Sequence, residues 1–213
     1  MSDDASKIKG NIVVCNRLRI DTDGEGVTTL VGMKGCPLKC KYCINKNLDD
    51  SKNKYHSVED LFNTVKRDDI YFQESGGGIC FGGHEPLLQS EYIREFKELL
   101  LKLGIGWKVY IETSLNVDTK EVINVISSID SWIIDIKDMN PRIYEEYTGK
   151  SNELVKENLG ILVRNIELHK IKIRLPIIEG YNSIADREKS KLELLSIGFG
   201  THNFDEFTYD INR

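Results

Sequence analysis

The chain has 213 residues, of which 40% are hydrophobic and 30% are charged, and its formal net charge is −5 at pH 7. These values are ordinary for a globular protein with a sizeable core. They exclude a generally basic surface of the kind that binds nucleic acid or anionic lipid. No stretch approaches the roughly 18 apolar residues that a membrane-spanning helix needs.

An N-terminal strand or hairpin arm is expected first, in residues 11–20. Apolar segments typical of buried strands then alternate with amphipathic segments typical of helices. Ser57 with Asp60 three residues later is typical of a helix start, and Gly104 is typical of a helix end. The expected strands are residues 27–33, 77–83, 107–114, 131–138, 171–178 and 204–211. The expected helices are residues 57–67, 90–104, 118–128, 140–147, 151–168 and 183–198.

About six strand–helix units in this order imply an α/β fold of parallel strands joined by right-handed crossovers. The strands read as continuous apolar runs, which fits a sheet that is covered on both faces. Six units are fewer than the eight of a closed (β/α)8 barrel. The pattern alone leaves open a partial barrel and a doubly wound open sheet. We expect a single domain over residues 1–213, with residues 1–26 as the N-terminal arm.

Residues suited to chemistry follow the ends of the expected strands. In parallel α/β folds, the carboxyl ends of the strands form the functional edge. Three thiols, several carboxylates, an arginine and a glycine-lined loop are therefore expected at one edge. The segments that would meet there after the first strand are residues 35–43, 82–86, 112–116, 135–140 and 174–180.

Three cysteines lie within eight residues in the segment GCPLKCKYC: Cys36, Cys40 and Cys43. Thiolates select soft metals and iron–sulfur clusters. Three thiolates on a four-iron cluster would leave one iron without a protein ligand, comparable to the open position of a catalytic zinc. The alternative is a zinc site with Cys80 or His56 as the fourth ligand. Cys15 and Cys80 are otherwise expected to be ordinary buried cysteines.

This spacing, with Tyr42 before the last cysteine, resembles the cluster loop of radical S-adenosylmethionine (SAM) enzymes. Further segments resemble, in order, the activating enzymes of glycyl radical enzymes, the group that includes the pyruvate formate-lyase activating enzyme. These segments are DGEGVTTLVGMKGCPLKCKYCIN, ESGGGICFGGHEPLLQ, YIETSLNV, WIIDIKDMN, YTGKSNELVKENL and KIRLPIIEGYN. The resemblance covers roughly residues 12–182 and implies a partial (β/α)6 barrel.

The resemblance implies two cofactors, a [4Fe–4S] cluster held by the three cysteines and SAM bound at its open iron. Reductive cleavage of SAM would give a 5′-deoxyadenosyl radical. The activating enzymes use this radical to take a hydrogen atom from a glycine Cα of a partner enzyme. The cofactor carries this chemistry, while the protein supplies orientation and excludes water.

The resemblance also implies contacts to SAM. Tyr42 matches an aromatic residue near the adenine. Gly82, Gly83 and Glu85 lie in the stretch that matches a glycine-glycine-glutamate motif, which binds the methionyl amino group. His84 occupies the position usually held by the second glycine. Its side chain requires either a negative φ there or a shifted strand end.

Other implied contacts lie on the later strands. Ser114 and Asn116 are near the segment that contacts the ribose, and Lys137 matches a lysine near the nucleoside. Arg174 matches a basic residue that can reach the methionyl carboxylate. Asp135 is expected to take part in cofactor binding.

Some activating enzymes bind a monovalent cation at a site that Glu112, Thr113 and Asp135 match, although an aspartate is usual where this chain has Glu112. The simpler expectation for these strand-end charges is an ion pair of Asp135 with Lys137 or Arg174.

Three functions remain open at this point. The first is an activating enzyme for a glycyl radical enzyme. The second is a radical SAM enzyme that modifies a peptide or a small metabolite, and the third is a non-catalytic iron–sulfur or zinc-binding protein. We expect a cytoplasmic monomer without a nucleic-acid or membrane partner, because the N-terminal segment is polar and the five cysteines do not resemble a disulfide framework.

Six lysines surround the cysteine loop: Lys34, Lys39, Lys41, Lys46, Lys52 and Lys54. The simplest interpretation is a solvated loop. The alternative is a docking site for an acidic reductant such as a flavodoxin or a ferredoxin-like protein. Longer activating enzymes continue beyond the point where this chain ends. We therefore expect a wide barrel mouth that admits a protein or peptide substrate.

Overall fold

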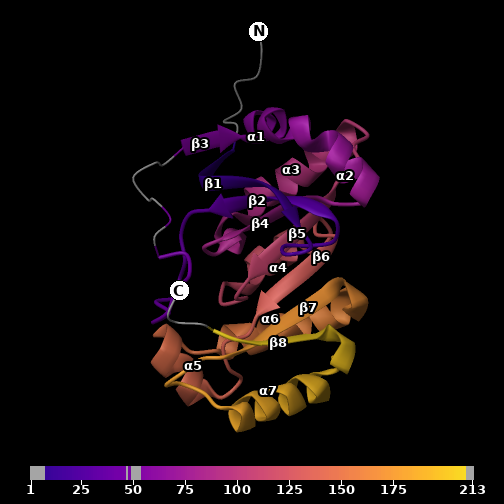
Figure 1. Ribbon diagram of the computed structural model, residues 1–213. Coiled ribbons are helices and arrows are strands. Elements are labelled where there is room, and N and C mark those ends of the chain that lie inside the picture. The colour runs from indigo at the N-terminus through magenta and orange to yellow at the C-terminus, as the bar shows by residue number, and fades with distance from the viewer. Residues whose placement is uncertain (1–7, 47, 49–53, 210–213) are drawn as a thin grey trace.

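The computed structural model describes residues 8–46, 48 and 54–209. The described residues form an eight-stranded sheet in the order β3-β1-β2-β4-β5-β6-β7-β8 (Figure 1). The strands are β1 (Lys9–Ile20), β2 (Val27–Met33), β3 (Lys54–Ser57), β4 (Gly78–Gly83), β5 (Lys108–Thr113), β6 (Ser131–Asp135), β7 (Ile171–Ile177) and β8 (Phe204–Thr208).

The helices lie in the connections between these strands. The α-helices of the described residues are α1 (Val58–Val65), α2 (Asp69–Ser75), α3 (Ser90–Lys102), α4 (Thr119–Val125), α5 (Pro141–Thr148), α6 (Glu153–Asn165) and α7 (Ile184–Ile197). The short 3-10 helices are η1 (Lys66–Asp68), η2 (Pro86–Gln89), η3 (Leu168–Lys170) and η4 (Thr201–Asn203). No helix in this part of the chain has both the length and the apolar character needed to cross a membrane.

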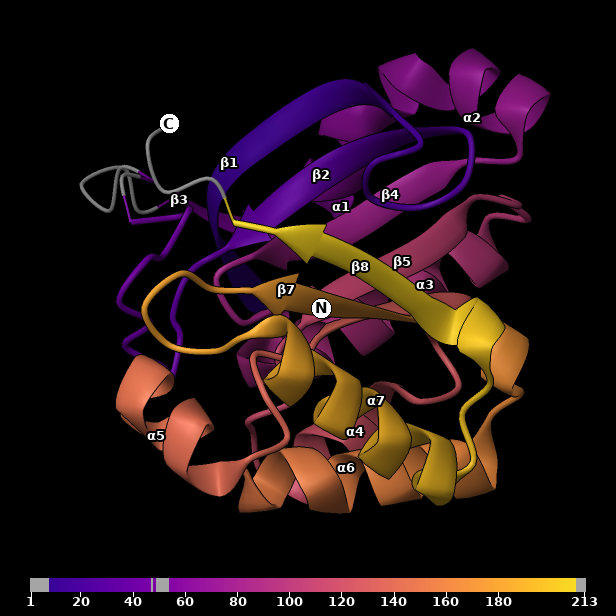
Figure 2. The same ribbon diagram turned by 60° about the horizontal axis from the view of Figure 1, so that its bottom comes forward.

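Six of the strands run parallel, from β2 through β4 to β8. Strand β1 pairs antiparallel with β2, and β3 pairs antiparallel with β1. The sheet has β3 at one edge and β8 at the other, so it does not close. Figure 2 shows the strands curving together with helices outside them. This arrangement confirms the partial barrel and excludes the doubly wound open sheet.

Most of the helices and strands predicted from local sequence patterns are present in the structure. The Ser57 hydroxyl accepts a hydrogen bond from the Asp60 amide at 3.1 Å and begins α1, as expected. Gly104 follows α3 with a φ of 69°, in the left-handed region. Strand β3 and helix α2 were not predicted. Residues 1–7 of the expected arm and residues 210–211 of the last expected strand lie outside the described residues.

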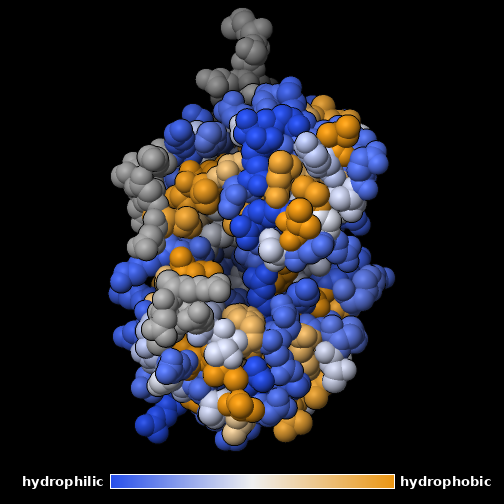
Figure 3. All heavy atoms as spheres, viewed as in Figure 1, coloured by the Kyte–Doolittle hydropathy of each residue, from blue (hydrophilic) through white to orange (hydrophobic). Residues whose placement is uncertain are grey.

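The core lies between the strands and the outer helices. In β4, the ring of Phe81 contacts Phe96 of α3, with 5.6 Å between the ring centroids. Successive side chains of a strand point to opposite faces, so Cys80 and Gly82 face the barrel interior. The surface in Figure 3 shows apolar residues as separate patches among hydrophilic ones.

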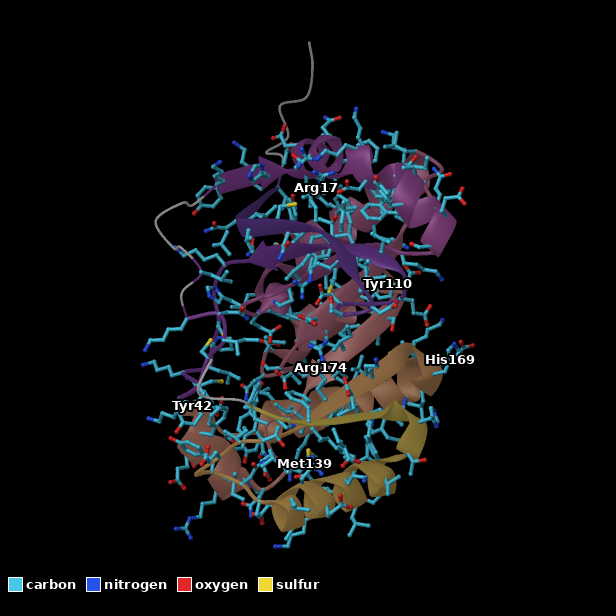
Figure 4. All side chains as sticks on the ribbon, in the orientation of Figure 1. Arg17, Tyr42, Tyr110, Met139, His169 and Arg174 are labelled. Atoms are coloured by element: carbon cyan, nitrogen blue, oxygen red, sulfur yellow. The ribbon has the colours of Figure 1, made fainter. Side chains whose placement is uncertain are left out.

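The turn between β1 and β2 folds back against the interior side of the sheet. The Arg174 guanidinium of β7 donates to the Thr22 carbonyl oxygen at 2.8 Å. Gly24 lies so close to Tyr110 of β5 that a Cβ there would be 2.7 Å from the tyrosine ring. Arg19 and Asp23 pair within the hairpin. The expected arm is thus tied to the middle of the barrel, where Figure 4 labels Tyr110 and Arg174.

A substitution of Gly78, at the start of β4, can test how closely β4 packs against β5. A Cβ on Gly78 would lie 2.1 Å from the Lys108 carbonyl oxygen of β5, where backbone cannot yield without breaking the pairing. We expect Gly78→Ala to lower the free energy of unfolding by about 3 kcal/mol in urea denaturation. Gly106→Ala is the control, because no heavy atom of the described residues lies within 4 Å of its added Cβ. Equal losses in the two variants would contradict the prediction.

Candidate active site

A cavity of about 510 Å³ lies at the carboxyl edge of the parallel strands. The loop after β2 forms one wall, and the ends of β4, β5, β6 and β7 form the other. The predicted site residues that line it are Cys36, Cys40, Tyr42, Cys43, Gly83, His84, Glu85, Glu112, Thr113, Ser114, Asp135, Lys137 and Arg174. The structure therefore confirms that thiols, carboxylates and an arginine lie together at one edge of the sheet.

Two residues that the sequence placed in the site, Gly82 and Asn116, do not line this cavity. Asn116 is buried, and its amide nitrogen donates to the Tyr144 hydroxyl at 3.0 Å and to the Ser151 carbonyl oxygen at 2.7 Å. Its side chain therefore ties the loop after β5 to the segment after α5. Gly82 faces the Glu112 carboxylate in the barrel interior instead.

The end of α5 holds the middle of the cysteine loop. The Lys39 amide donates to the Thr148 carbonyl oxygen at 2.8 Å, and the Lys41 amide donates to the Tyr147 carbonyl oxygen at 3.1 Å. The last carbonyls of a helix lack partners within the helix, so they are ready acceptors. This role was not predicted, although both helix residues lie in the segment YTGKSNELVKENL.

The three thiols differ in exposure. Cys36 and Cys43 are exposed, and Cys40 is partly buried. Desolvation raises the pKa of the Cys36 and Cys40 thiols to about 11. A metal ligand must be the thiolate, so metal binding at these sulfurs would release their protons.

The chemistry of the donor set fits an iron–sulfur cluster. Three thiols from one loop, Cys36, Cys40 and Cys43, line the same cavity. A cubane cluster takes each thiolate on a different iron, so its ligands do not converge on one point. The suggested fourth zinc ligands, Cys80 and His56, are not in the described lining of the cavity. Cys80 is fully buried in β4 as expected, whereas Cys15 is only partly buried.

Glu85 joins the ends of β4 and β5. Its carboxylate accepts from the Thr113 hydroxyl at 2.7 Å and from the Ser114 hydroxyl and amide at 2.7 and 2.9 Å. Burial raises the pKa of Glu85, and these hydrogen bonds oppose the rise. The carboxylate thus fixes the Ser114 side chain beside the cavity.

Lys137, Asp135 and Tyr209 form an interior network at the end of β6. The Lys137 ammonium pairs with Asp135 Oδ2 and donates to the Tyr209 hydroxyl at 2.7 Å. Burial disfavours the charged lysine, but Asp135 and Tyr209 outweigh it and raise the pKa of Lys137 well above its usual value. The expected Asp135–Lys137 ion pair is confirmed. Tyr209, from beyond β8, also lines the cavity, and sequence reasoning gave no signal for it.

One carboxylate oxygen in this network is unused. Asp135 Oδ1 is buried and has no hydrogen-bond partner among the described residues. An unpaired buried acceptor is costly, so such an atom beside a cavity suggests that a ligand donor completes it.

Arg174 pairs with a carboxylate on β5. Its guanidinium donates to Glu112 Oε1 at 2.7 Å, besides its bond to the hairpin turn. The alternative ion pair of Arg174 with Asp135 is not formed among the described residues. Asp135 lies beside Arg174 on the adjacent strand β6, but the guanidinium pairs with Glu112 on β5, one strand further along the sheet. With Glu112 engaged, a cation site at Glu112, Thr113 and Asp135 stays a prediction.

Aromatic rings form one side of the cavity mouth. The Tyr42 ring lies 6.3 Å from Tyr147 and 5.8 Å from Tyr181, between ring centroids. Tyr42 remains 40% exposed and is labelled at the left side of the molecule in Figure 4. An exposed ring held by two others gives a planar apolar surface suited to a flat ligand group.

The backbone of His84 has an ordinary conformation at the end of β4. The non-glycine residues with positive φ in the described chain are Leu18, Asp21 and Leu115, so His84 has the negative φ that was one of two alternatives. The strand end is not shifted, because Met33 pairs with Gly83 in regular register.

Four of the six lysines expected around the cysteine loop line the cavity: Lys34, Lys39, Lys41 and Lys46. Lys54 begins β3. Lys52 lies outside the described residues. The cavity mouth therefore has a basic loop on one side.

Comparison with known proteins connects this geometry to a family. The radical SAM superfamily model matches residues 30–189. The (2S)-3-sulfopropanediol dehydratase activating enzyme of Klebsiella oxytoca is 37% identical over 75% of this chain and 69% of its own length. The pyruvate formate-lyase 1-activating enzyme of Escherichia coli (strain K12) is 27% identical over 90% of this chain and 72% of its own length.

Solved structures support the fold. SuiB of Streptococcus suis bound to S-adenosylmethionine superposes with a TM-score of 0.59 at 14% identity, covering 85% of this chain. The chain spans 38% of the length of SuiB. The structure of anSMEcpe with bound AdoMet superposes with a TM-score of 0.51 at 18% identity over 82% of this chain. At these identities the likeness concerns the partial barrel alone.

The Lys137 network makes a testable prediction. Lys137→Met would leave the Asp135 carboxylate without its cationic partner in a largely buried site. Breaking such a pair is strongly destabilising, so we expect a loss of about 3 kcal/mol in the free energy of unfolding. Urea denaturation at neutral pH measures it, with the exposed Lys150→Met as control. If both variants unfold at the same urea concentration, the pair does not hold the site together.

Proposed function

The chain belongs to the radical SAM superfamily, and we propose that it activates a glycyl radical enzyme by removing a hydrogen atom from one of that enzyme's glycine Cα positions. It is a radical SAM enzyme, and its cofactors are a [4Fe–4S] cluster and SAM. One observation carries the proposal. Cys36, Cys40 and Cys43, which have the spacing of the family, line one cavity together with the predicted residues at the strand ends. This chain is 37% identical to an activating enzyme.

We propose the following roles for the site residues. Cys36, Cys40 and Cys43 hold the cluster. Tyr42 presents its ring to the adenine, and the segment of Gly82, Gly83, His84 and Glu85 receives the methionyl amino group. Ser114 belongs to the ribose side, and Asn116 supports the same segment from behind through its bonds to Tyr144 and Ser151. Lys137 lies near the nucleoside. Arg174 stays within reach of the methionyl carboxylate, and Asp135 Oδ1 is free to accept a hydrogen bond from SAM.

The chemistry divides between cofactors and chain. When bound, the cluster supplies the electron that cleaves SAM into methionine and a 5′-deoxyadenosyl radical. The chain orients the nucleoside, with the Lys137 ammonium fixed by Asp135 and Tyr209. Glu85, held by Thr113 and Ser114, keeps the ends of β4 and β5 in register beside the cofactor. Such preorganisation limits the volume in which the radical can react.

The partner is proposed from chemistry as well as from the relatives. A glycine Cα–H bond is accessible to this reaction because a glycine loop can extend into a cavity without side-chain clashes. We propose that the protein is a single-domain monomer of the cytoplasm, and that an acidic flavodoxin or ferredoxin-like protein reduces it. A small metabolite as substrate would be the competing outcome.

The decisive experiment is anaerobic turnover with a glycyl radical enzyme encoded beside this gene, followed by electron paramagnetic resonance. The proposal expects a doublet whose splitting changes when the substrate glycine is deuterated at Cα. It also expects that deuterium appears in 5′-deoxyadenosine. Transfer of deuterium from a small metabolite or from a residue other than glycine would reject the activating function and leave the radical chemistry intact.

The cysteine assignment can be tested separately. We expect Cys36→Ala, Cys40→Ala and Cys43→Ala to abolish SAM cleavage, because each removes a cluster ligand. Cys15→Ala and Cys80→Ala are the matched controls and should retain it, since neither residue lines the cavity. Iron content and 5′-deoxyadenosine formation after anaerobic reconstitution are the measurements. Turnover by Cys40→Ala would disprove the ligand set.

The basic loop predicts a salt-dependent reduction rate. Electrostatic steering of an acidic reductant weakens as the Debye length shrinks. We expect reduction by flavodoxin to slow about tenfold between roughly 0.01 M and 0.15 M ionic strength. Lys41→Glu should slow the reaction at low salt, whereas Lys172→Glu, exposed on β7, should not. A rate independent of salt would leave these lysines as solvated loop residues.

A further inference from the structure

The segment that follows Cys43 is joined to the end of β4 by two hydrogen bonds. The Asn45 side-chain amide donates to the Gly83 carbonyl oxygen. The His84 ring nitrogen Nε2 lies 3.3 Å from the Asn45 carbonyl oxygen. A carbonyl oxygen only accepts, so Nε2 must carry the proton and donate. These two bonds are called the Asn45–His84 contact below.

This contact holds a part of the loop that has few other attachments. The first part of the loop is fixed by the Glu85 amide, which donates to the Gly35 carbonyl oxygen at 2.8 Å. The middle is fixed by the end of α5. Beyond Cys43, the Asn45–His84 contact provides the hydrogen bonds to the sheet among the described residues; the other backbone bonds there are local.

Both ends of the cysteine loop therefore attach to the same three residues at the end of β4. Gly83 and His84 hold the end after Cys43, and Glu85 holds the end before Cys36. His84 stands where the family motif has a glycine, which has no side chain to reach the loop. The histidine adds a hydrogen bond that a glycine at this position could not make.

We propose that His84 is a positioning residue that, with Asn45, holds Cys43 in place before the cluster is bound. His84 therefore acts through the loop and is not a ligand of the metal. A loop fixed in advance loses less conformational freedom on binding, so cluster retention should depend on this contact. The claim about the loop stands without any cofactor, whereas the claim about retention rests on the proposed function.

The first test uses the full chain without its cluster, under anaerobic reducing conditions. Hydrogen–deuterium exchange is followed in the peptide that contains residues 43–46. We expect His84→Ala and Asn45→Ala each to speed exchange about three- to tenfold, the range for loss of one hydrogen bond. His84→Gln should restore near-normal exchange, because a glutamine amide can place a donor close to the position of Nε2.

The matched control is His169→Ala, an exposed histidine at the other side of the barrel (Figure 4). It should leave loop exchange unchanged. Exchange in the β4 and β5 peptides reports whether a variant loosens the whole sheet. Unchanged loop exchange in His84→Ala, or faster exchange that His84→Gln does not restore, would overturn the proposal.

The second test follows loss of the reconstituted cluster to a ferrous-iron chelator by visible absorbance. We expect about three- to tenfold faster loss in His84→Ala and Asn45→Ala and near-normal loss in His84→Gln. Normal retention in all variants would overturn the link between the contact and the cluster. Failure of the wild-type chain to assemble a cluster would reject the proposed function, while the exchange experiment would still decide the role of His84.

Discussion

The close approach of β2 and β4 at their carboxyl ends is the constraint on which the site depends. Gly83 has a φ of 85°, and a Cβ on it would lie 2.8 Å from the Gly32 Cα. Only glycine fits this contact without strain. Because the two strands touch there, the cysteine loop leaves β2 directly beside the segment that carries His84 and Glu85. A bulkier residue at Gly83 would move two walls of the cavity apart at once.

Charged pairs line the cavity within the barrel, together with apolar side chains such as Ile133. Arg174 with Glu112 links β7 to β5, and Lys137 with Asp135 fixes the end of β6. Taking these ions from water costs much of what their attraction returns, so they are weak evidence for stability. Their effect is geometric. They set the spacing of three strand ends, and through the Thr22 carbonyl oxygen they also set the position of the β1–β2 turn.

The sequence predicted the six parallel strands and their functional edge because apolar runs and the cysteine spacing are local signals. It could not predict β3, because the residues KYHS become a strand only by pairing with β1. Tyr209 lies at the site because β8 pairs with β7, and Asn45 lies there because of the path of the loop after β2. A local sequence pattern predicts neither the strand order nor the loop path. Asn116 was placed at the ribose side by its position after β5. Its burial depends on hydrogen bonds to Tyr144 and Ser151, which are distant in the sequence, so no local pattern indicated it.

The two walls of the cavity differ in how their charges are arranged. The loop wall has Lys39, Lys41 and Lys46, whereas on the strand wall Asp135 and Glu112 are paired with Lys137 and Arg174. Under the proposed function, a cluster with three thiolates is negative and lies on the basic side. On the strand wall, the unpaired Asp135 Oδ1 is an acceptor that would be available to a donor group of SAM. Fixed charges of this kind need no reorganisation when a charged ligand arrives, so the loop lysines and the acceptor at Asp135 would be in place before the cofactors bind.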